Sequence, residues 1–275
     1  MYSVFDALSL LTPYDIDKPK VRLVPAEDGG YVFADDLAPD QPVMSYGIGK
    51  QYEFDRQMAE RGHQVFMFDH TIRGIKAPHP NMHFFKQGVA GRTDAANDLY
   101  CLADHIAMNG ITSDRIILKM DVEGAEYDAL AAVDDATFDR IDQIVLELHG
   151  LKKLWRPKWL EAFVNTMTRL NGRFTLFHVH ANNYDGRELH VLSGMPVCNV
   201  LELSYIRSSR VGRSPSTTVY PTPLDRPNRP WADKLLWFYP FLPTTAGIEA
   251  FRTGHDRNAA LPERPPSPNA VAPAQ

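Results

Sequence analysis

Apolar and polar positions alternate in blocks along the middle of the chain. Segments of helical spacing predict helices at residues 54–61, 99–109, 123–133 and 159–170. Short apolar runs predict seven strands, at residues 43–46, 64–68, 83–85, 116–120, 144–148, 174–179 and 200–206. Strands that alternate with helices indicate an α/β fold with a mostly parallel sheet and helices on both faces. A turn-rich segment joins the last two runs, which favours an antiparallel pair at the sheet edge.

The pattern divides the chain into three parts. Residues 1–42 predict an N-terminal helix and a hairpin, whose tight turn uses Gly29 and Gly30. Residues 43–206 carry the repeating strand and helix pattern. Residues 207–275 form a Pro-rich C-terminal extension, because twelve of the 21 prolines lie between Pro215 and Pro273.

Within the extension, residues 208–230 predict an extended linker, and residues 259–275 predict disorder. The aromatic segment at residues 231–242 has three interpretations. It packs on the body, it covers a substrate site, or it contacts a membrane surface or a partner protein.

Composition narrows the class of protein. Cys101 and Cys198 have no metal-like spacing, which indicates a reducing compartment without a disulfide framework. No apolar run approaches the ~18 residues of a membrane span, and no secretory signal is evident. We therefore expect a cytoplasmic protein.

Charge is spread unevenly along the chain. The net charge is −5, which argues against a nucleic-acid partner. From Arg207 onward nine basic and five acidic residues give 9 − 5 = +4, so the preceding body carries −5 − 4 = −9. An acidic body with a basic tail suggests different tasks for the two parts.

Acidic residues follow the apolar run at residues 116–120. Asp121, Glu123 and Glu126 come where a buried parallel strand reaches the carboxyl edge of the sheet, the usual ligand-binding edge of such folds. Buried carboxylates are costly without partners. Glu123 and Glu126 also suit the first turn of a helix, so for them a capping role and a site role are equally open. Asp121 is expected to serve the site.

A second candidate region follows the first two strands of the sheet. Gly47 and Gly49 predict a turn that lets the backbone approach a ligand, and the alternative is a plain tight turn. Asp69 lies ~20 residues further on, the spacing at which an acid meets a ribose diol. Its alternative is a helix N-cap. A dinucleotide fingerprint needs a third glycine, but Tyr52 and Glu53 follow instead.

Residues 119–126, with the sequence KMDVEGAE, resemble the signature motif of the FkbM-type S-adenosylmethionine-dependent methyltransferases. Residues 28–31, 45–49, 68–69, 178–184 and 200–203 fit as well, so the resemblance covers residues 21–207. It implies a Rossmann-like methyltransferase fold and S-adenosylmethionine as the cofactor. It also implies a purine site near Gly88 and Val89, and it supports a cofactor or substrate role for Asp121.

Histidines and amides supply the remaining candidates. His149 follows the fifth strand, next to the strand that ends at Asp121, and suits a general base; a structural histidine is the alternative. His178, His180, Asn182 and Asn183 are expected to bind the substrate. No spacing signature supports a metal, so none is predicted, although Asp121 with two histidines is a conceivable ligand set.

These features predict a methyltransferase, with an oxygen of a small molecule or a saccharide as acceptor. Two alternatives remain, an NAD(P)-dependent oxidoreductase and a non-catalytic scaffold. The oligomeric state is left open.

Overall fold

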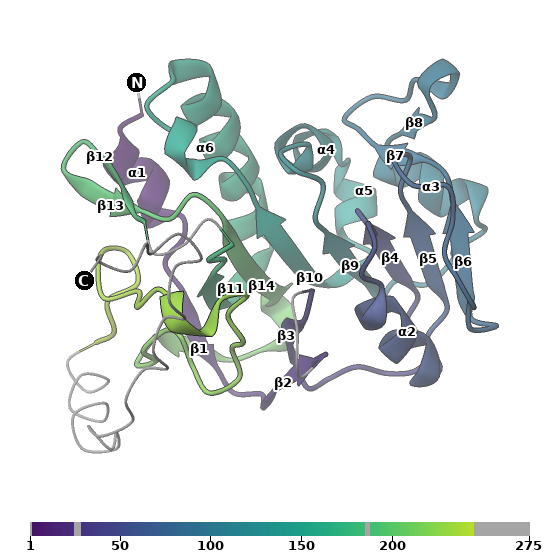
Figure 1. Cartoon of the computed structure of the whole chain (residues 1–275), viewed down its shortest axis with the longest axis horizontal. Helices are drawn as coiled ribbons and strands as arrows, with labels where there is room; N and C mark the ends of the chain where they lie inside the picture. The colour runs from purple at the N-terminus through teal and green to yellow at the C-terminus, as the bar shows by residue number, and fades with distance from the viewer. Residues whose placement is uncertain (1, 25–28, 185–187, 245–275) are drawn as a thin grey trace, which may run out of the picture.

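A seven-stranded sheet forms the centre of the computed structural model, which describes residues 2–24, 29–184 and 188–244. Its strand order is β6-β5-β4-β9-β10-β14-β11 (Figure 1). The strands are β4 (Val43–Tyr46), β5 (Val65–Phe68), β6 (Met82–Phe85), β9 (Ile116–Met120), β10 (Ile141–Leu148), β11 (Phe174–Ala181) and β14 (Leu201–Arg207). The strands β6, β5, β4, β9 and β10 run parallel to one another. Strand β14 runs antiparallel to both of its neighbours, β10 and β11. The predicted mostly parallel sheet with an antiparallel edge pair is confirmed.

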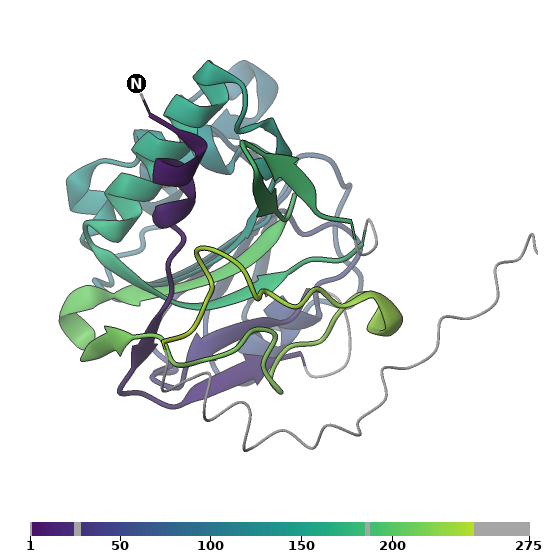
Figure 2. The same cartoon turned by 90° about the vertical axis from the view of Figure 1, so that its left-hand side faces the viewer.

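Helices and a hairpin cover the two faces of the sheet (Figure 2). The α-helices are α1 (Val4–Ser9), α2 (Glu53–Glu60), α3 (Leu102–Met108), α4 (Glu126–Ala132), α5 (Asp135–Phe138) and α6 (Pro157–Asn171). Buried side chains of α1, α3, α4 and α6 pack on one face. On the other face, α2 packs together with the hairpin of β2 (Lys20–Leu23) and β3 (Tyr31–Ala34). The prediction of helices on both faces is confirmed.

The two-residue period of the strands explains this division. Met44 and Tyr46 belong to the larger core with α4 and α6, while Val43 belongs to the core with α2. On β9, Leu118 and Ile117 divide in the same way. Both faces of each central strand are buried, as the near-continuous apolar runs predict.

Shorter elements complete the described chain. Small two-stranded sheets pair β1 (Tyr14–Ile16) with β15 (Arg213–Pro215), β7 (Gly88–Val89) with β8 (Leu99–Tyr100), and β12 (His190–Leu192) with β13 (Met195–Val197). The 3-10 turns are η1 (Ala95–Asn97), η2 (Leu151–Lys153), η3 (Ser208–Arg210) and η4 (Pro230–Ala232). Among the helices of the described ranges, none has both the length and the apolar character needed to cross a lipid bilayer.

The segment after Arg207 packs along the body. Its strand β15 pairs with β1, and the fully buried Tyr220 donates a hydrogen bond to the carbonyl oxygen of Phe177. The predicted linker is thus extended but packed. The segment for which disorder was predicted, residues 259–275, lies outside the described residues.

Buried histidines of β11 bind this segment. His178 Nε2 lies 2.7 Å from an oxygen of Asp225, and His180 lies 3.0 Å from Glu202 of β14 and 3.3 Å from Asp233. Burial opposes protonation of His180, but the carboxylates of Glu202 and Asp233 outweigh it and raise the pKa of His180 to about 10. His180 is therefore charged at neutral pH and bridges two elements.

Replacing His180 by Gln is expected to remove a pH-dependent part of the stability. The pKa of His180 is about 10 in the folded chain and near 6.5 in the unfolded chain. The stabilisation is therefore complete below pH 6.5 and is lost as the pH rises through about 10. In urea unfolding, the gap in free energy between wild type and His180→Gln should shrink by more than about 1 kcal/mol between pH 6 and pH 10. For the control His83→Gln, the difference in free energy of unfolding from wild type should not change with pH. A decline as large as that of His180→Gln would contradict the assignment of this stabilisation to His180.

Candidate active site

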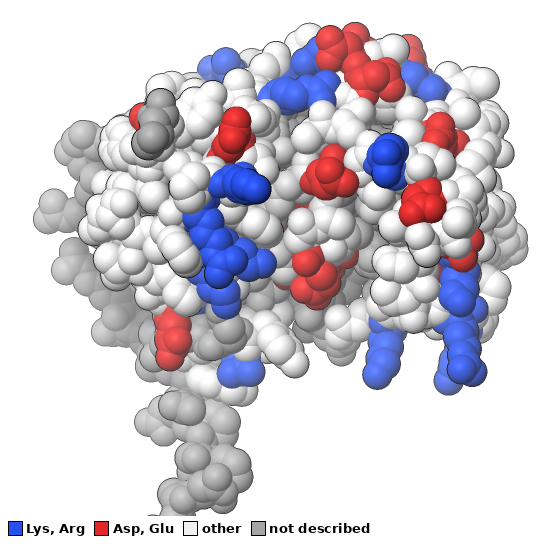
Figure 3. All heavy atoms as spheres, turned by 90° about the horizontal axis from the view of Figure 1, so that it is seen from above, with Lys and Arg blue, Asp and Glu red and all other residues white. Residues whose placement is uncertain are grey.

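A cavity of about 1060 Å³ lies at the carboxyl edge of the parallel strands, between the ends of β4, β5, β9 and β10. Figure 3 looks onto this side of the molecule and shows acidic groups around the hollowed middle, with basic groups on either side. Gly47, Gly49, Asp69, Asp121 and His149 all line the cavity. The structure thus brings the two predicted regions into one site.

The glycine turn after β4 touches the end of β9. Gly47 has a φ of +75°, and a Cβ atom on it would lie 1.6 Å from the carbonyl oxygen of Asp121. Gly49 has a φ of +58° and nothing within 4 Å of its Cβ position. Gly47 is therefore required both by its conformation and by close packing, whereas Gly49 is required by conformation alone.

Asp69, at the end of β5, holds this turn in place. Its Oδ2 accepts hydrogen bonds from the amides of Ile48 (3.0 Å) and Gly49 (2.8 Å), and its Oδ1 accepts from the amide and the hydroxyl of Thr71 (2.7 and 2.6 Å). Burial opposes ionisation, but these hydrogen bonds lower the pKa of Asp69 below its usual value. The carboxylate is thus ionised, and all four bonds are to the protein itself.

Gly88 and Val89 form part of the wall beside Asp69. Both line the cavity, and both belong to the short strand β7. A Cβ atom on Gly88 would lie 2.5 Å from the ring of His70. A side chain at this position would therefore displace the neighbouring ring.

Two buried charges that the sequence did not single out face the cavity near the glycine turn. Lys119 of β9 donates hydrogen bonds to the carbonyl oxygens of Tyr46 (3.1 Å) and Gly47, and lies 3.9 Å from Asp121. Asp55 of α2 is 2% exposed, and its Oδ1 makes no hydrogen bond within the described part of the chain. Burial raises the pKa of Asp55 to about 6, against the opposing effect of Lys119. A buried carboxylate that lines a cavity and keeps one oxygen without a hydrogen bond in the described chain fits a cationic ligand group.

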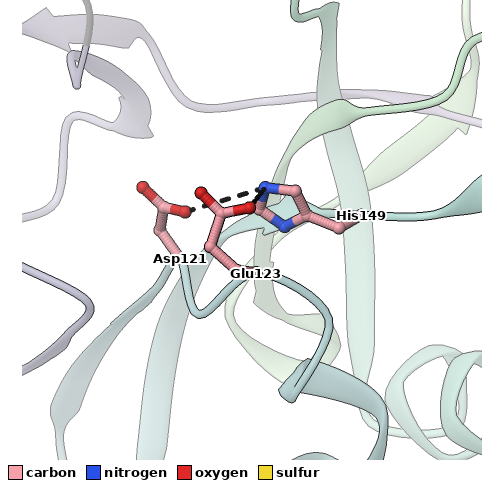
Figure 4. A group of neighbouring side chains, drawn as sticks. All are labelled: Asp121, Glu123 and His149. Carbon is pink, nitrogen blue, oxygen red and sulfur yellow. Dashed lines mark ion pairs between the residues drawn. The ribbon is translucent and has the colours of Figure 1, made fainter. Parts of the chain in front are cut away.

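Four carboxylates surround the imidazole of His149. Glu126 Oε1 lies 2.8 Å from Nδ1, while Nε2 lies 3.9 Å from Asp121, 3.5 Å from Glu123 and 3.7 Å from Glu147. Figure 4 shows Asp121 and Glu123 converging on the Nε2 side of the ring. We call Asp121, Glu123, Glu126, Glu147 and His149 the acid–imidazole cluster.

Local structure fixes the ring of His149. The residue follows β10, next to β9, as expected from the strand order. The hydroxyl of Tyr127 donates to its carbonyl oxygen (2.8 Å), and the fully buried Glu126 holds Nδ1. Burial would lower the pKa of His149, but Glu126, Asp121 and Glu123 outweigh it and raise that pKa. Burial raises the pKa of Asp121, against Lys119 and His149.

The predicted substrate residues divide between two places. Asn182 lines the cavity and donates to Glu147 Oε1 (2.8 Å). Within the described residues, His178, His180 and Asn183 are not part of the cavity wall. Asn183 exchanges hydrogen bonds with the backbone of Arg229, and the two histidines bind acids. The substrate role predicted for these three stays a prediction; in the described chain their side chains bind neighbouring acids and the C-terminal segment.

Sequence reasoning missed three contributors to the site. A lysine within the apolar run of β9 was a usable signal for Lys119, since buried lysines need partners. Asp55 gave no signal, because acids are common in the first turn of a helix. Asn228 lines the cavity from the C-terminal segment, and only the packing of that segment reveals it.

The sheet order, the glycine turn and the acids at the carboxyl edge are the features expected of the S-adenosylmethionine-dependent methyltransferase fold. Residues 38–172 match the family model of the methyltransferase FkbM domain. This match confirms the resemblance to the FkbM-type methyltransferases that was found in the sequence. Comparison with curated proteins gave no match.

The solved structures that the chain matches share little sequence with it. The 23S rRNA methyltransferase ErmE has 13% identity and a TM-score of 0.37, with 63% of this chain covered. The chain spans 64% of the ErmE chain. A predicted O-methyltransferase from Agrobacterium tumefaciens has 12% identity and a TM-score of 0.36, with 65% and 78% of the two chains covered. A SAM-dependent methyltransferase from the same organism has 14% identity and a TM-score of 0.34, with 61% and 56% covered.

The two glycines of the turn provide a matched pair of variants. Gly47→Ala should lose measurable S-adenosylmethionine binding and several degrees of melting temperature, because its Cβ collides with the backbone of Asp121. Gly49→Ala should cost only about 1–2 kcal/mol of stability for the left-handed conformation. Calorimetric titration and thermal melts of both variants test this. If both variants lost the same amount of S-adenosylmethionine affinity and melting temperature, the close packing of Gly47 against Asp121 would not matter for the site.

Proposed function

We propose that the chain transfers a methyl group from S-adenosylmethionine to a hydroxyl oxygen of a small molecule or a saccharide. The observation that supports this is the joining, in one cavity, of the Asp69-held glycine turn and the acid–imidazole cluster. One part of the cavity suits a nucleoside, and the other suits a group that must lose a proton.

The cofactor would lie along the glycine turn. Asp69 would bind the ribose, with the hydroxyl of Thr71 giving up its hydrogen bond, and the purine would lie against Gly88 and Val89. Gly47 and Gly49 would form the floor. When bound, S-adenosylmethionine supplies a methyl group on a positively charged sulfur.

Two charged side chains of the protein match the ammonium and carboxylate groups at the amino-acid end of the cofactor. Asp55, with its unbonded Oδ1, suits the ammonium group, and Lys119 suits the carboxylate. Asp121 lies 3.9 Å from Lys119 and lines the same cavity, between the turn and His149. Asp121 would thus serve both the cofactor and the acceptor.

The acceptor hydroxyl would lie at the acid–imidazole cluster. Asp121 or His149 would take its proton as the oxygen attacks, which is worth roughly 10²–10⁴-fold in rate. Holding the oxygen in line with the methyl group contributes more, about 7–11 kcal/mol in well-oriented reactions. Asn182, Asn228 and Tyr184 line the cavity on this side, and their amides and phenol suit a polyhydroxylated acceptor.

A thermal-shift measurement with four ligands tests the cofactor assignment. S-adenosylmethionine and S-adenosylhomocysteine should each raise the melting temperature, because a ligand at 100 times its Kd adds about 2.7 kcal/mol to stability. NAD and NADP should have no effect. Stabilisation by NAD(P) alone would favour the oxidoreductase, and no stabilisation by any of the four would favour a scaffold.

Replacing Asp55 by Asn should weaken S-adenosylmethionine binding at least tenfold, because the variant removes the charge that faces the ammonium group. Glu53→Gln, on the exposed side of the same helix, is the matched control and should bind normally. Calorimetric titration measures both. Unchanged affinity in Asp55→Asn would remove Asp55 from the cofactor site.

Replacing His149 by Gln should lower kcat for methyl transfer by ~10²-fold or more, with little change in S-adenosylmethionine affinity. The reason is that the imidazole faces the acceptor part of the cavity. Transfer of labelled methyl to candidate polyols, with His83→Gln as control, measures the effect. Full turnover in His149→Gln would exclude a role in proton removal.

A further inference from the structure

The acid–imidazole cluster holds more negative than positive charge. Asp121, Glu123 and Glu126 supply three carboxylates, and the cations in the contacts described above are His149 and Lys119, so 2 − 3 leaves an excess of one negative charge even with a protonated imidazole. The fully buried Glu126 also has an oxygen, Oε2, without a hydrogen-bond partner in the described chain. An excess of carboxylates beside a largely buried imidazole points to a positively charged ligand.

The imidazole has the orientation of a metal-binding histidine. Its Nδ1 is bonded to the Glu126 carboxylate, so the lone pair of the neutral ring lies on Nε2, on the side of Asp121 and Glu123. A carboxylate behind a histidine that fixes its tautomer in this way is the usual support for a metal ligand.

We propose that Asp121, Glu123 and His149 form a binding site for one divalent cation of the Mn²⁺ or Mg²⁺ type. One ligand atom from each residue lies within 4.8 Å of the others (Figure 4). Ligands about 2.1 Å from an octahedral ion are ~3.0 Å apart when adjacent and ~4.2 Å apart when opposite. The observed separations from Nε2, 3.5 Å and 3.9 Å, fall within this range, and the side chain of Glu123 is 87% exposed and free to adjust.

The ligand set selects the kind of ion. Two carboxylates with one imidazole suit a hard or borderline divalent cation, whereas a soft ion would require thiolates. The site differs from the conceivable metal set of the sequence analysis, because His178 and His180 bind acids of other elements. The proposed site also differs from the prediction, made from the sequence, that the chain binds no metal.

The cation would lie in the acceptor part of the cavity. Its catalytic use rests on the proposed function: a bound cation lowers the pKa of a coordinated hydroxyl, the task otherwise given to a base. Glu147 lines the cavity beside the three ligands, and the proton of the hydroxyl would pass to its carboxylate. The binding itself depends only on the three side chains.

Direct titration of the full chain with Mn²⁺ tests the site. After treatment with a chelator and its removal, free Mn²⁺ is followed by electron paramagnetic resonance, without cofactor or acceptor. We expect one bound Mn²⁺ per chain in the wild type. Glu123→Gln should weaken binding at least tenfold without altering the fold, because its side chain is largely exposed. Glu60→Gln, an exposed acid on α2 outside the cavity, should bind as wild type.

The outcomes separate this inference from the proposed function. No Mn²⁺ binding up to 1 mM (roughly −4 kcal/mol), or equal binding by Glu123→Gln and Glu60→Gln, would overturn the metal site. If S-adenosylmethionine nevertheless stabilises the chain and methyl transfer proceeds in EDTA, the proposed function stands without it. If Mn²⁺ binds and S-adenosylmethionine does not, the metal site stands and the proposed function fails.

Discussion

The close approach of Gly47 to the backbone of Asp121 is the constraint on which the site depends. It brings the turn after β4 against the end of β9 with no room for a Cβ atom. Lys119 strengthens this contact between the turn and β9, because its ammonium group donates hydrogen bonds to the carbonyl oxygens of Tyr46 and Gly47. The parts of the cavity that we propose for the nucleoside and for the acceptor thereby become adjacent.

Charge burial accounts for the rest of the site. Asp69 is stabilised as a carboxylate by four protein donors, which makes it a rigid support for the turn. Asp55 and Glu126 each keep one buried oxygen without a hydrogen bond in the described chain. Asp55 lines the cavity and therefore supports our placement of the cofactor ammonium group, whereas Glu126 binds Nδ1 of His149 and fixes the ring whose Nε2 faces the proposed cation.

The C-terminal segment takes part in the same arrangement. Its acids bind His178 and His180 of β11, and its Asn228 reaches the cavity. Asn182 connects the two regions, because it accepts from Asn228 and donates to Glu147. Residues that lie after the methyltransferase FkbM domain thus form one wall of its cavity.

The sequence alone predicted the seven strands of the main sheet, their mostly parallel direction and the resemblance to the FkbM family, because those follow from local features: apolar runs, their spacing and the motif at residues 119–126. It did not predict the strands of the three small sheets that pair β1 with β15, β7 with β8 and β12 with β13, and β8 lies where a helix was predicted at residues 99–109. Burial and pairing depend on segments far apart in the chain, and only the tertiary structure decided them. It showed that Glu126, in the first turn of α4, accepts from the amide of Val122 and also holds the ring of His149. It also showed that the histidines of β11 bind acids of β14 and of the C-terminal segment. A side chain's chemistry can be read from the sequence, but its partner is set by packing, and the partner determines whether the group remains free to act.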